Sequence, residues 1–176
     1  MSSQTLTPFS YAILVLVGRG GAGAHDLVRM ARQGRIYAAA AESQYYAEPK
    51  RLERLGYLSS RKGPGRTNER THYSLTEKGL DALRGWAREP VRFPRVLHEG
   101  VVRLLAADLV GEEPVREGIV ALSRELDELE TLLDAADAIA ATFPHREKYL
   151  RINHRLARRL IAAHRDWIAD VKRELG

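Results

Sequence analysis

The 176-residue sequence contains no cysteine. This absence excludes disulfide bonds, thiolate catalysis and zinc sites with cysteine ligands, and it favours the reducing cytoplasm. Long hydrophobic runs are missing as well, because the best candidate, residues 11–17, is far shorter than the ~20 residues that cross a bilayer. The first ten residues contain no basic stretch before that run, so we expect no signal peptide. The sequence therefore predicts a cytoplasmic protein without a membrane segment.

Motifs for catalysis and for metal binding are also absent. The six histidines form no H-E-x-x-H pair, and no G-x-S-x-G nucleophile motif occurs. The acidic residues between positions 112 and 137 are typical of a solvated helix face and not of paired catalytic carboxylates. We therefore expect no metal, no cofactor and no enzymatic activity.

One glycine-rich segment runs against that expectation. Gly18–Gly23 reads G-x-G-x-x-G, the form of a dinucleotide-binding loop, and Glu42 follows about 20 residues later. Such a loop follows a strand, whereas residues 9–17 have helical spacing after a Thr7-Pro8 start. An NAD-binding enzyme is therefore the weakest of the hypotheses that we consider.

Positive charge predominates, and it is concentrated in one half of the chain. The sequence has 28 Lys and Arg against 23 Asp and Glu, a net charge of +5. Residues 1–90 carry 14 basic and 8 acidic side chains (net +6), whereas residues 91–176 carry 14 and 15 (net −1). A basic half predicts a polyanionic partner. Pro90 and Pro94 mark the junction, so we expect two domains, 1–90 and 91–176.

The first half begins with short helices separated by glycine. Apolar residues at helical spacing predict helices over 7–17 and 24–34, and a third from Ser43 toward Gly56. Pro49 lies inside the third helix, where it should kink the helix or delay its regular start.

After the third helix the period changes. Residues 57–58 and 71–75 read as strands joined by a long basic turn over 61–70, and Thr76 caps a further helix. Three helices, a β-hairpin and a helix are the order of a winged helix-turn-helix. We expect this module to be a winged helix-turn-helix with a two-stranded β-hairpin wing.

The second half predicts long amphipathic helices. One apolar seam advances by alternate steps of four and three residues, and a second apolar series follows the Phe143-Pro144 break. Residues 112–137 carry a net −7 and residues 146–174 a net +5, which predicts antiparallel packing within one chain or across a dimer. The expected dimerisation residues are Val115, Ile119, Leu122, Leu126, Leu129 and Leu133 on the first helix and Ile152, Leu156, Leu160 and Trp167 on the second. The fold class is thus mostly α, with a coiled-coil dimerisation arm after the winged helix.

The first half also contains a series of short motifs. They are Pro8-Phe9-Ser10-Tyr11-Ala12-Ile13-Leu14, Tyr46, Arg51-Leu52-Glu53, Leu55-Gly56 and Tyr73-Ser74-Leu75-Thr76-Glu77-Lys78-Gly79. In their order and spacing these motifs resemble the PadR family of transcriptional regulators. The resemblance covers residues 7–88, and the two long helices match the dimerising C-terminal part of that family in pattern. It implies a homodimer that places one helix per subunit in the DNA major groove, with the wing on the flanking backbone.

The residues themselves support DNA binding. A helix fits the major groove, where base edges carry a readable pattern, and Lys and Arg bind phosphates. Gln44 suits adenine, Tyr46 offers a ring and a hydroxyl, and Tyr45 is either a DNA contact or part of the core. The predicted DNA-binding residues are Ser43, Gln44, Tyr45, Tyr46, Lys50, Arg51 and Arg54 on the helix and Arg61, Lys62, Arg66, Asn68, Arg70 and His72 in the wing.

The leading hypothesis is a dimeric, sequence-specific DNA-binding regulator that represses by blocking a promoter. The PadR resemblance also implies a small aromatic effector that releases the DNA, and Trp86, Phe93 and Trp167 permit a cleft for it. The alternative from another class is a winged-helix protein-interaction module whose basic wing docks an acidic partner. Titration with NAD and with random duplex DNA would separate these hypotheses.

Overall fold

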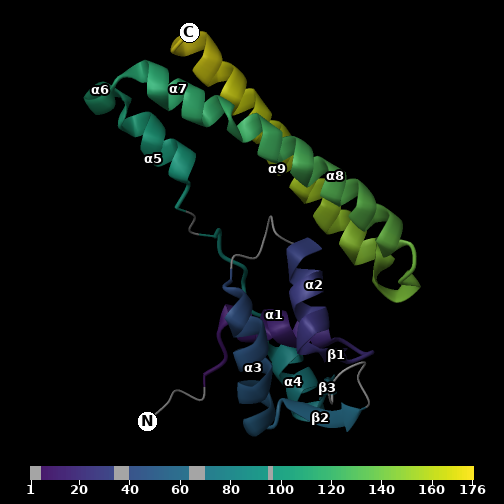
Figure 1. Ribbon diagram of the computed structural model, residues 1–176. Coiled ribbons are helices and arrows are strands. Elements are labelled where there is room, and N and C mark those ends of the chain that lie inside the picture. The colour runs from purple at the N-terminus through teal and green to yellow at the C-terminus, as the bar shows by residue number, and fades with distance from the viewer. Residues whose placement is uncertain (1–4, 34–39, 64–69, 95–96) are drawn as a thin grey trace. The chain divides into compact units, whose positions relative to one another are not determined.

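The computed structural model describes residues 5–33, 40–63, 70–94 and 97–176. The chain divides into two compact units, Met1–Arg92 (unit 1) and Phe93–Gly176 (unit 2). In the described residues, unit 1 combines helices with a small sheet, whereas unit 2 consists of helices and their connections (Figure 1).

Unit 1 begins with a helix whose sequence caps both of its ends. α1 (Pro8–Val17) follows Thr7, whose hydroxyl accepts a hydrogen bond from the Ser10 N–H while the Thr7 N–H donates to the Ser10 hydroxyl. Pro8 occupies the first helical position, where its missing N–H costs nothing. Gly18 ends α1 with a φ of 55°, which favours glycine. The predicted start and stop of this helix are confirmed.

Three further helices form unit 1: α2 (Ala24–Gln33), α3 (Glu42–Arg54) and α4 (Glu77–Trp86). α4 follows its Thr76 cap as predicted. α3 begins at Glu42, so Ser43 lies in the first turn and is not the cap. The helix runs through Pro49, and the expected delay of its start is wrong. The Pro49 ring is fully buried, and this burial offsets the hydrogen bond that proline deletes.

A three-stranded antiparallel sheet completes unit 1. Its strands are β1 (Ala22–Gly23), β2 (Leu58–Gly63) and β3 (Arg70–Leu75), in the spatial order β1-β3-β2. Strand β1 pairs with β3 at Tyr73 and His72, which the sequence did not predict because a two-residue strand has no periodicity to detect. The two strands predicted for the hairpin, β2 and β3, pair antiparallel, and β1 adds a third strand to the sheet.

Strands β2 and β3 extend farther than the sequence predicted. Arg61 and Lys62 lie in β2 opposite His72 and Thr71, and not in the connecting turn. Serine, arginine and lysine are poor strand signals, so cross-strand pairing decided these boundaries. Residues 64–69 lie outside the described residues, and with them the predicted DNA-binding residues Arg66 and Asn68.

The glycines of residues 18–23 form the turn from α1 into β1. Gly21 has a φ of 72°, and a Cβ at this position would lie 2.6 Å from the Tyr73 carbonyl oxygen. The preceding element is helix α1, whereas a dinucleotide-binding loop follows a strand. The glycine motif therefore has a local structural reason, and the NAD hypothesis loses the context that it requires.

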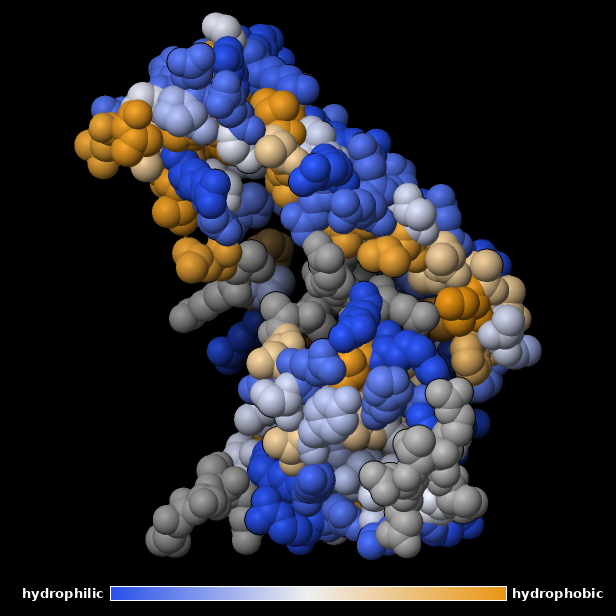
Figure 2. All heavy atoms as spheres, viewed as in Figure 1, coloured by the Kyte–Doolittle hydropathy of each residue, from blue (hydrophilic) through white to orange (hydrophobic). Residues whose placement is uncertain are grey.

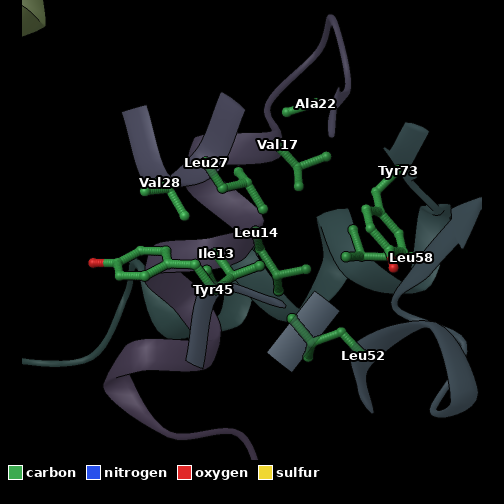
Figure 3. Packing of buried hydrophobic residues seen from close by; sticks show 10 residues of the cluster. All are labelled: Ile13, Leu14, Val17, Ala22, Leu27, Val28, Tyr45, Leu52, Leu58 and Tyr73. Atoms are coloured by element: carbon green, nitrogen blue, oxygen red, sulfur yellow. The ribbon is translucent and has the colours of Figure 1, made fainter. Parts of the chain in front are cut away.

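The core of unit 1 lies between its helices and its sheet. Figure 3 shows Ile13 and Leu14 of α1 between Leu27 of α2 and Leu52 of α3, and all four side chains are fully buried. Burial of a leucine or isoleucine side chain contributes about 1.5–3 kcal/mol. This packing determines which side of α3 faces inward.

A polar network joins the same side of α3 to α1. The buried Ser10 hydroxyl donates to Glu48 Oε1 at 2.6 Å. Arg51 donates from Nε to Glu48 Oε2 at 3.0 Å and from Nη2 to Ser10 Oγ at 3.2 Å. Arg51, which the sequence predicted to bind DNA phosphate, is held here by Glu48 one turn earlier and by Ser10 of α1.

Unit 2 contains α5 (Glu99–Leu105), α6 (Ala107–Val110), α7 (Glu112–Val120), α8 (Leu122–Ala140) and α9 (Pro144–Glu174). α9 begins at Pro144, which confirms the predicted break. The sequence analysis did not assign α5 and α6, which are short. Within the described residues, no helix combines the length and the apolar character that crossing a membrane requires.

Helices α7 and α8 pack along α9 through part of the predicted seam (Figure 1). The residues buried in this contact are Val115, Ile119, Leu126 and Leu133 on α7–α8 and Ala157, Ile161, Ile168 and Val171 on α9. The predicted α9 residues Ile152, Leu156 and Leu160 are 46%, 49% and 38% exposed. α9 therefore has two apolar faces: one packs along α7 and α8, and the other carries Ile152, Leu156 and Leu160, whose role in dimerisation stays a prediction.

Ion pairs join the antiparallel helices α8 and α9. Arg165 contacts Asp127 near the start of α8, and Arg158 contacts Asp137 near its end. His154 hydrogen-bonds to Asp137 at 2.6 Å, and this bond, followed by the one from Arg158, holds the pKa of Asp137 below its usual range. The complementary charges thus meet within one chain, one of the two arrangements that the sequence allowed.

A pair of histidines attaches α5 to α9. The Val101 N–H donates to His98 Nδ1 at 3.2 Å, which leaves the proton of a neutral His98 on Nε2. His98 Nε2 then donates to His164 Nε2 at 2.9 Å, and His164 Nδ1 donates to the Leu160 carbonyl at 2.7 Å. Every ring nitrogen has a partner, so the pair is a structural link between the two helices.

We expect Arg51→Met to lower the free energy of unfolding by about 2–3 kcal/mol, because Glu48 loses its charged partner in a mostly buried place. Arg54→Met on the same helix is the matched control and should change stability by less than about 0.5 kcal/mol, since Arg54 is exposed. Urea unfolding at neutral pH, followed by circular dichroism, measures both values. Equal effects of the two substitutions would contradict the role given to Arg51.

Candidate nucleic-acid interface

Helix α3 divides its residues between the core and the surface. Tyr45, Pro49 and Leu52 are buried. Residues at spacings of three and four lie on another side of the helix and are exposed, because such residues share one face. They are Ser43, Tyr46, Ala47, Lys50 and Arg54.

Tyr45 belongs to the core and is corrected as a DNA contact. Its side chain is 4% exposed, and its ring meets Phe9 edge-on with 5.1 Å between centroids. Burial raises the pKa of the Tyr45 hydroxyl. The neighbouring Tyr46 lies about 100° around the helix and is 39% exposed.

Strands β2 and β3, which we call the wing, present different residues on their two faces. Side chains alternate along a strand, so Ser60 and Lys62 of β2 share a face with Thr71 and Tyr73 of β3. These four residues and the exposed side of α3 line one groove. The wing face that includes Ser60 and Lys62 is therefore the face turned toward α3.

Arg61, Arg70 and His72 lie on the opposite face of the wing. Arg61 and Arg70 are exposed, so they stay available for a partner outside the groove. His72 is half-buried, and its ring lies 3.3 Å from the Gly20 carbonyl oxygen and close to Gly21. His72 therefore contacts the turn before β1, and its role as a DNA contact stays a prediction.

The groove between α3 and the wing is cationic on both walls. Lys50 and Arg54 come from α3, and Lys62 comes from β2. Lys50 and Arg54 form no ion pair with other described residues, whereas in unit 2 ion pairs hold Arg103, Arg151, Arg158, Arg165 and Arg173. Hydrophilic surface covers the region of α3 in Figure 2. The full lining consists of Ser43, Tyr46, Ala47, Lys50, Glu53, Arg54, Ser60, Lys62, Thr71 and Tyr73.

Gln44 is exposed but does not line the groove. It lies about 100° around α3 from Ser43, toward the side that carries Arg51. In the first turns of α3, the polar side chains that line the groove are thus Ser43 and Tyr46. Gln44 lies next to Ser43 at the amino-terminal end of the helix, outside the groove.

Two of the residues expected to permit an effector cleft, Trp86 and Trp167, have packing partners within their own units. In unit 1, Trp86 stacks on Tyr11 with 4.6 Å between ring centroids. In unit 2, the Trp167 ring meets His98 edge-on at 5.4 Å, and Phe93 is 94% exposed. Among the described residues, no three His, Asp or Glu side chains gather where they could hold a metal ion.

Sequence reasoning missed five residues of the groove: Ala47, Glu53, Ser60, Thr71 and Tyr73. Glu53 accepts a hydrogen bond from the Ser60 hydroxyl and so joins α3 to β2. The signal available for Ser60 and Thr71 was strand alternation, which places them on the same face as Lys62 once β2 is known to reach Gly63. The mixture of basic and polar residues in that stretch concealed the strand.

No protein-family model and no curated protein matches the sequence. Solved structures do match. Bacillus subtilis PadR in complex with operator DNA superposes with a TM-score of 0.73 at 19% identity over 96% of this chain and 98% of that chain. The same protein in complex with p-coumaric acid gives a TM-score of 0.64 at 18% identity over 95% and 96%.

Two further structures extend the comparison. The PadR-like transcriptional regulator BC1756 from Bacillus cereus has a TM-score of 0.77 at 12% identity over 99% of this chain and 98% of that chain. The virulence activator AphA from Vibrio cholerae has a TM-score of 0.65 at 23% identity over 94% and 95%. Since these matches span nearly the whole length of both chains, the chain has the mostly helical winged-helix fold of the PadR-type regulators.

Proposed function

We propose that the protein is a sequence-specific DNA-binding transcriptional regulator of the PadR type. The observation that carries the proposal is the groove between α3 and the wing, which has cations on both walls. Its fold is the fold of a protein whose structure includes operator DNA. A cytoplasmic location is part of the same proposal, because a regulator acts where its DNA lies.

In the proposed complex α3 lies in the major groove and one DNA strand passes between α3 and the wing. Lys50 and Arg54 on one wall and Lys62 on the other bind its phosphates, and binding releases counterions. Arg61 and Arg70 on the outer wing face reach the flanking backbone or minor groove. Phosphate contacts of this kind position the protein without reading sequence.

Sequence is read by the amino-terminal part of α3. Ser43, Gln44 and Tyr46 are exposed there and offer an alcohol, an amide and a phenol to base edges. The bidentate amide of Gln44 suits adenine. A protein-interaction module would need none of these groups in this place, so we prefer DNA to an acidic protein as the partner.

The active form in this proposal is a homodimer assembled through the second apolar face of α9. Tyr149, Ile152, Leu156 and Leu160 are exposed on this face, which lies roughly 110° around the helix from the buried seam. A helix with two apolar faces requires neighbours on both. In the described residues α7 and α8 cover the buried seam, and α5 contacts α9 at His164 and Trp167, whereas Tyr149, Ile152 and Leu156 stay exposed. Figure 2 shows further hydrophobic surface near α6 and near the end of α8, which suits burial against a second copy.

A dimer places two winged helices on one duplex, with half-sites about 34 Å apart or a multiple of that spacing. Repression by blocking a promoter belongs to the proposal. The Vibrio cholerae neighbour is a virulence activator, so this fold also occurs in an activator. A small aromatic effector belongs to it as well, because a structure with this fold contains p-coumaric acid.

The first test selects duplexes from a random pool with the purified protein and compares the selected duplex with a shuffled one. We expect salt-sensitive binding to both and tighter binding to the selected duplex. Lys50→Gln and Arg54→Gln should each weaken both complexes and reduce the slope of log affinity against log salt by about one. Fluorescence anisotropy at several salt concentrations measures this.

Arg84→Gln is the control for net charge, because Arg84 is paired with Glu77 and Asp81 on α4 and does not line the groove. It should leave the slope unchanged. If the wild-type protein binds selected and shuffled duplexes equally at every salt concentration, or does not bind them, the proposed function is wrong.

Leu156→Asp should convert the dimer to a monomer at micromolar concentration, because it places a charge in the centre of the proposed interface. Helical content should stay unchanged, since Leu156 does not belong to the buried seam. Ala169→Asp, on another exposed side of α9, is the matched control and should remain dimeric. Sedimentation or light scattering reports the mass, and a monomeric wild-type protein would contradict the dimer.

A further inference from the structure

An acidic residue lies inside the cationic groove. Glu53 follows Lys50 by three positions on α3, and both side chains reach the groove. Glu53 is the only acid among the described lining residues, beside the three cations Lys50, Arg54 and Lys62. A surface that served only to collect phosphates would be stronger without this carboxylate.

Glu53 connects the two walls of the groove. Its Oε1 accepts a hydrogen bond from the Ser60 hydroxyl of β2. Ser60 in turn pairs with Tyr73 of β3, so the bond reaches the middle of the sheet. This link limits how far the wing moves away from α3, and therefore sets the width of the groove.

The charge of Glu53 also acts on the floor of the groove. The pKa of the buried Tyr73 hydroxyl is raised by burial and, to a smaller extent, by the Glu53 carboxylate. Glu53 is half-buried, so solvent screens it less than an exposed acid. A phosphate at the rim meets Lys50 and Arg54, whereas a phosphate that moves toward the floor meets a like charge.

We propose that Glu53 is a specificity-determining and positioning residue of the DNA interface, holding the wing through Ser60 and keeping DNA phosphates at the rim of the groove. The inference rests on the proposed function. On DNA of random sequence, phosphate contacts alone hold the protein, so the DNA backbone moves to where the attraction to the groove is strongest. On the preferred sequence, base contacts fix the position of the DNA. The Glu53 carboxylate therefore lowers the affinity for random sequence more than the affinity for the preferred sequence. Specificity is the ratio of these two affinities, so the carboxylate raises it.

Glu53→Gln tests the charge, because the amide oxygen still accepts the Ser60 hydrogen bond. We expect the affinity for the shuffled duplex to rise about tenfold and that for the selected duplex by no more than about twofold. Glu89→Gln is the matched control: Glu89 is an exposed acid of unit 1 that does not line the groove. It should change both affinities by the same small factor.

Ser60→Ala tests the link, because it keeps the charge and removes the hydrogen bond. We expect the affinity for the selected duplex to fall about three- to tenfold, with little change for the shuffled duplex. Thermal melting of each variant confirms that it is folded before its affinities are compared.

The ratio of the wild-type affinities for the selected and the shuffled duplex is measured first. If the wild-type protein binds the selected and the shuffled duplex with equal affinity, the proposed function itself is wrong. If the wild type discriminates and Glu53→Gln keeps the same ratio, the proposed function stands and the role of the Glu53 charge is overturned. An unchanged selected-duplex affinity in Ser60→Ala overturns its positioning role.

Discussion

Helix α3 is pressed against α1 by the burial of Tyr45, Pro49 and Leu52, and each of its exposed cations takes its position from that contact. The network of Ser10, Glu48 and Arg51 holds the same side by hydrogen bonds. Because a helix repeats every 3.6 residues, fixing these positions also fixes the direction of the exposed side. Proline inside this helix weakens the backbone ladder, yet its buried ring strengthens the contact that orients α3.

Strand β3 supplies the second constraint. It pairs with β1 on one side and β2 on the other, and Tyr73 inserts into the core next to Leu58 (Figure 3). Register and alternation then place Lys62 toward α3 and Arg61 away from it. The cationic groove thus results from two rigid elements that meet over one core, and Glu53 joins them directly. Its geometry depends on residues that have no contact with DNA in the proposed complex.

The sequence predicted the order of helices in unit 1, because capping residues and glycine stops act locally. It did not predict β1 or the length of β2, since strand pairing depends on partners far away in the chain. Arg51 and Arg54 show the same limit for the site. Both are basic residues on one helix, but the position of α1 brings Ser10 against Arg51 and its partner Glu48, whereas Arg54 stays exposed. The sequence also did not predict which apolar residues of α9 meet α8, because periodicity identifies apolar residues that share a face but not the element that packs against them.

The charges of unit 2 are largely neutralised within it. Arg158 and Arg165 pair with acids of α8, so the basic helix α9 contributes less to attraction at a distance than its composition suggests. Interactions between exposed charges fade over about 8 Å at physiological salt, and a polyanion therefore responds mainly to the unpaired cations of unit 1. The modest net charge of +5 conceals this difference. Assembly through the second apolar face of α9 would leave those cations free, because the two tasks use different units of the chain.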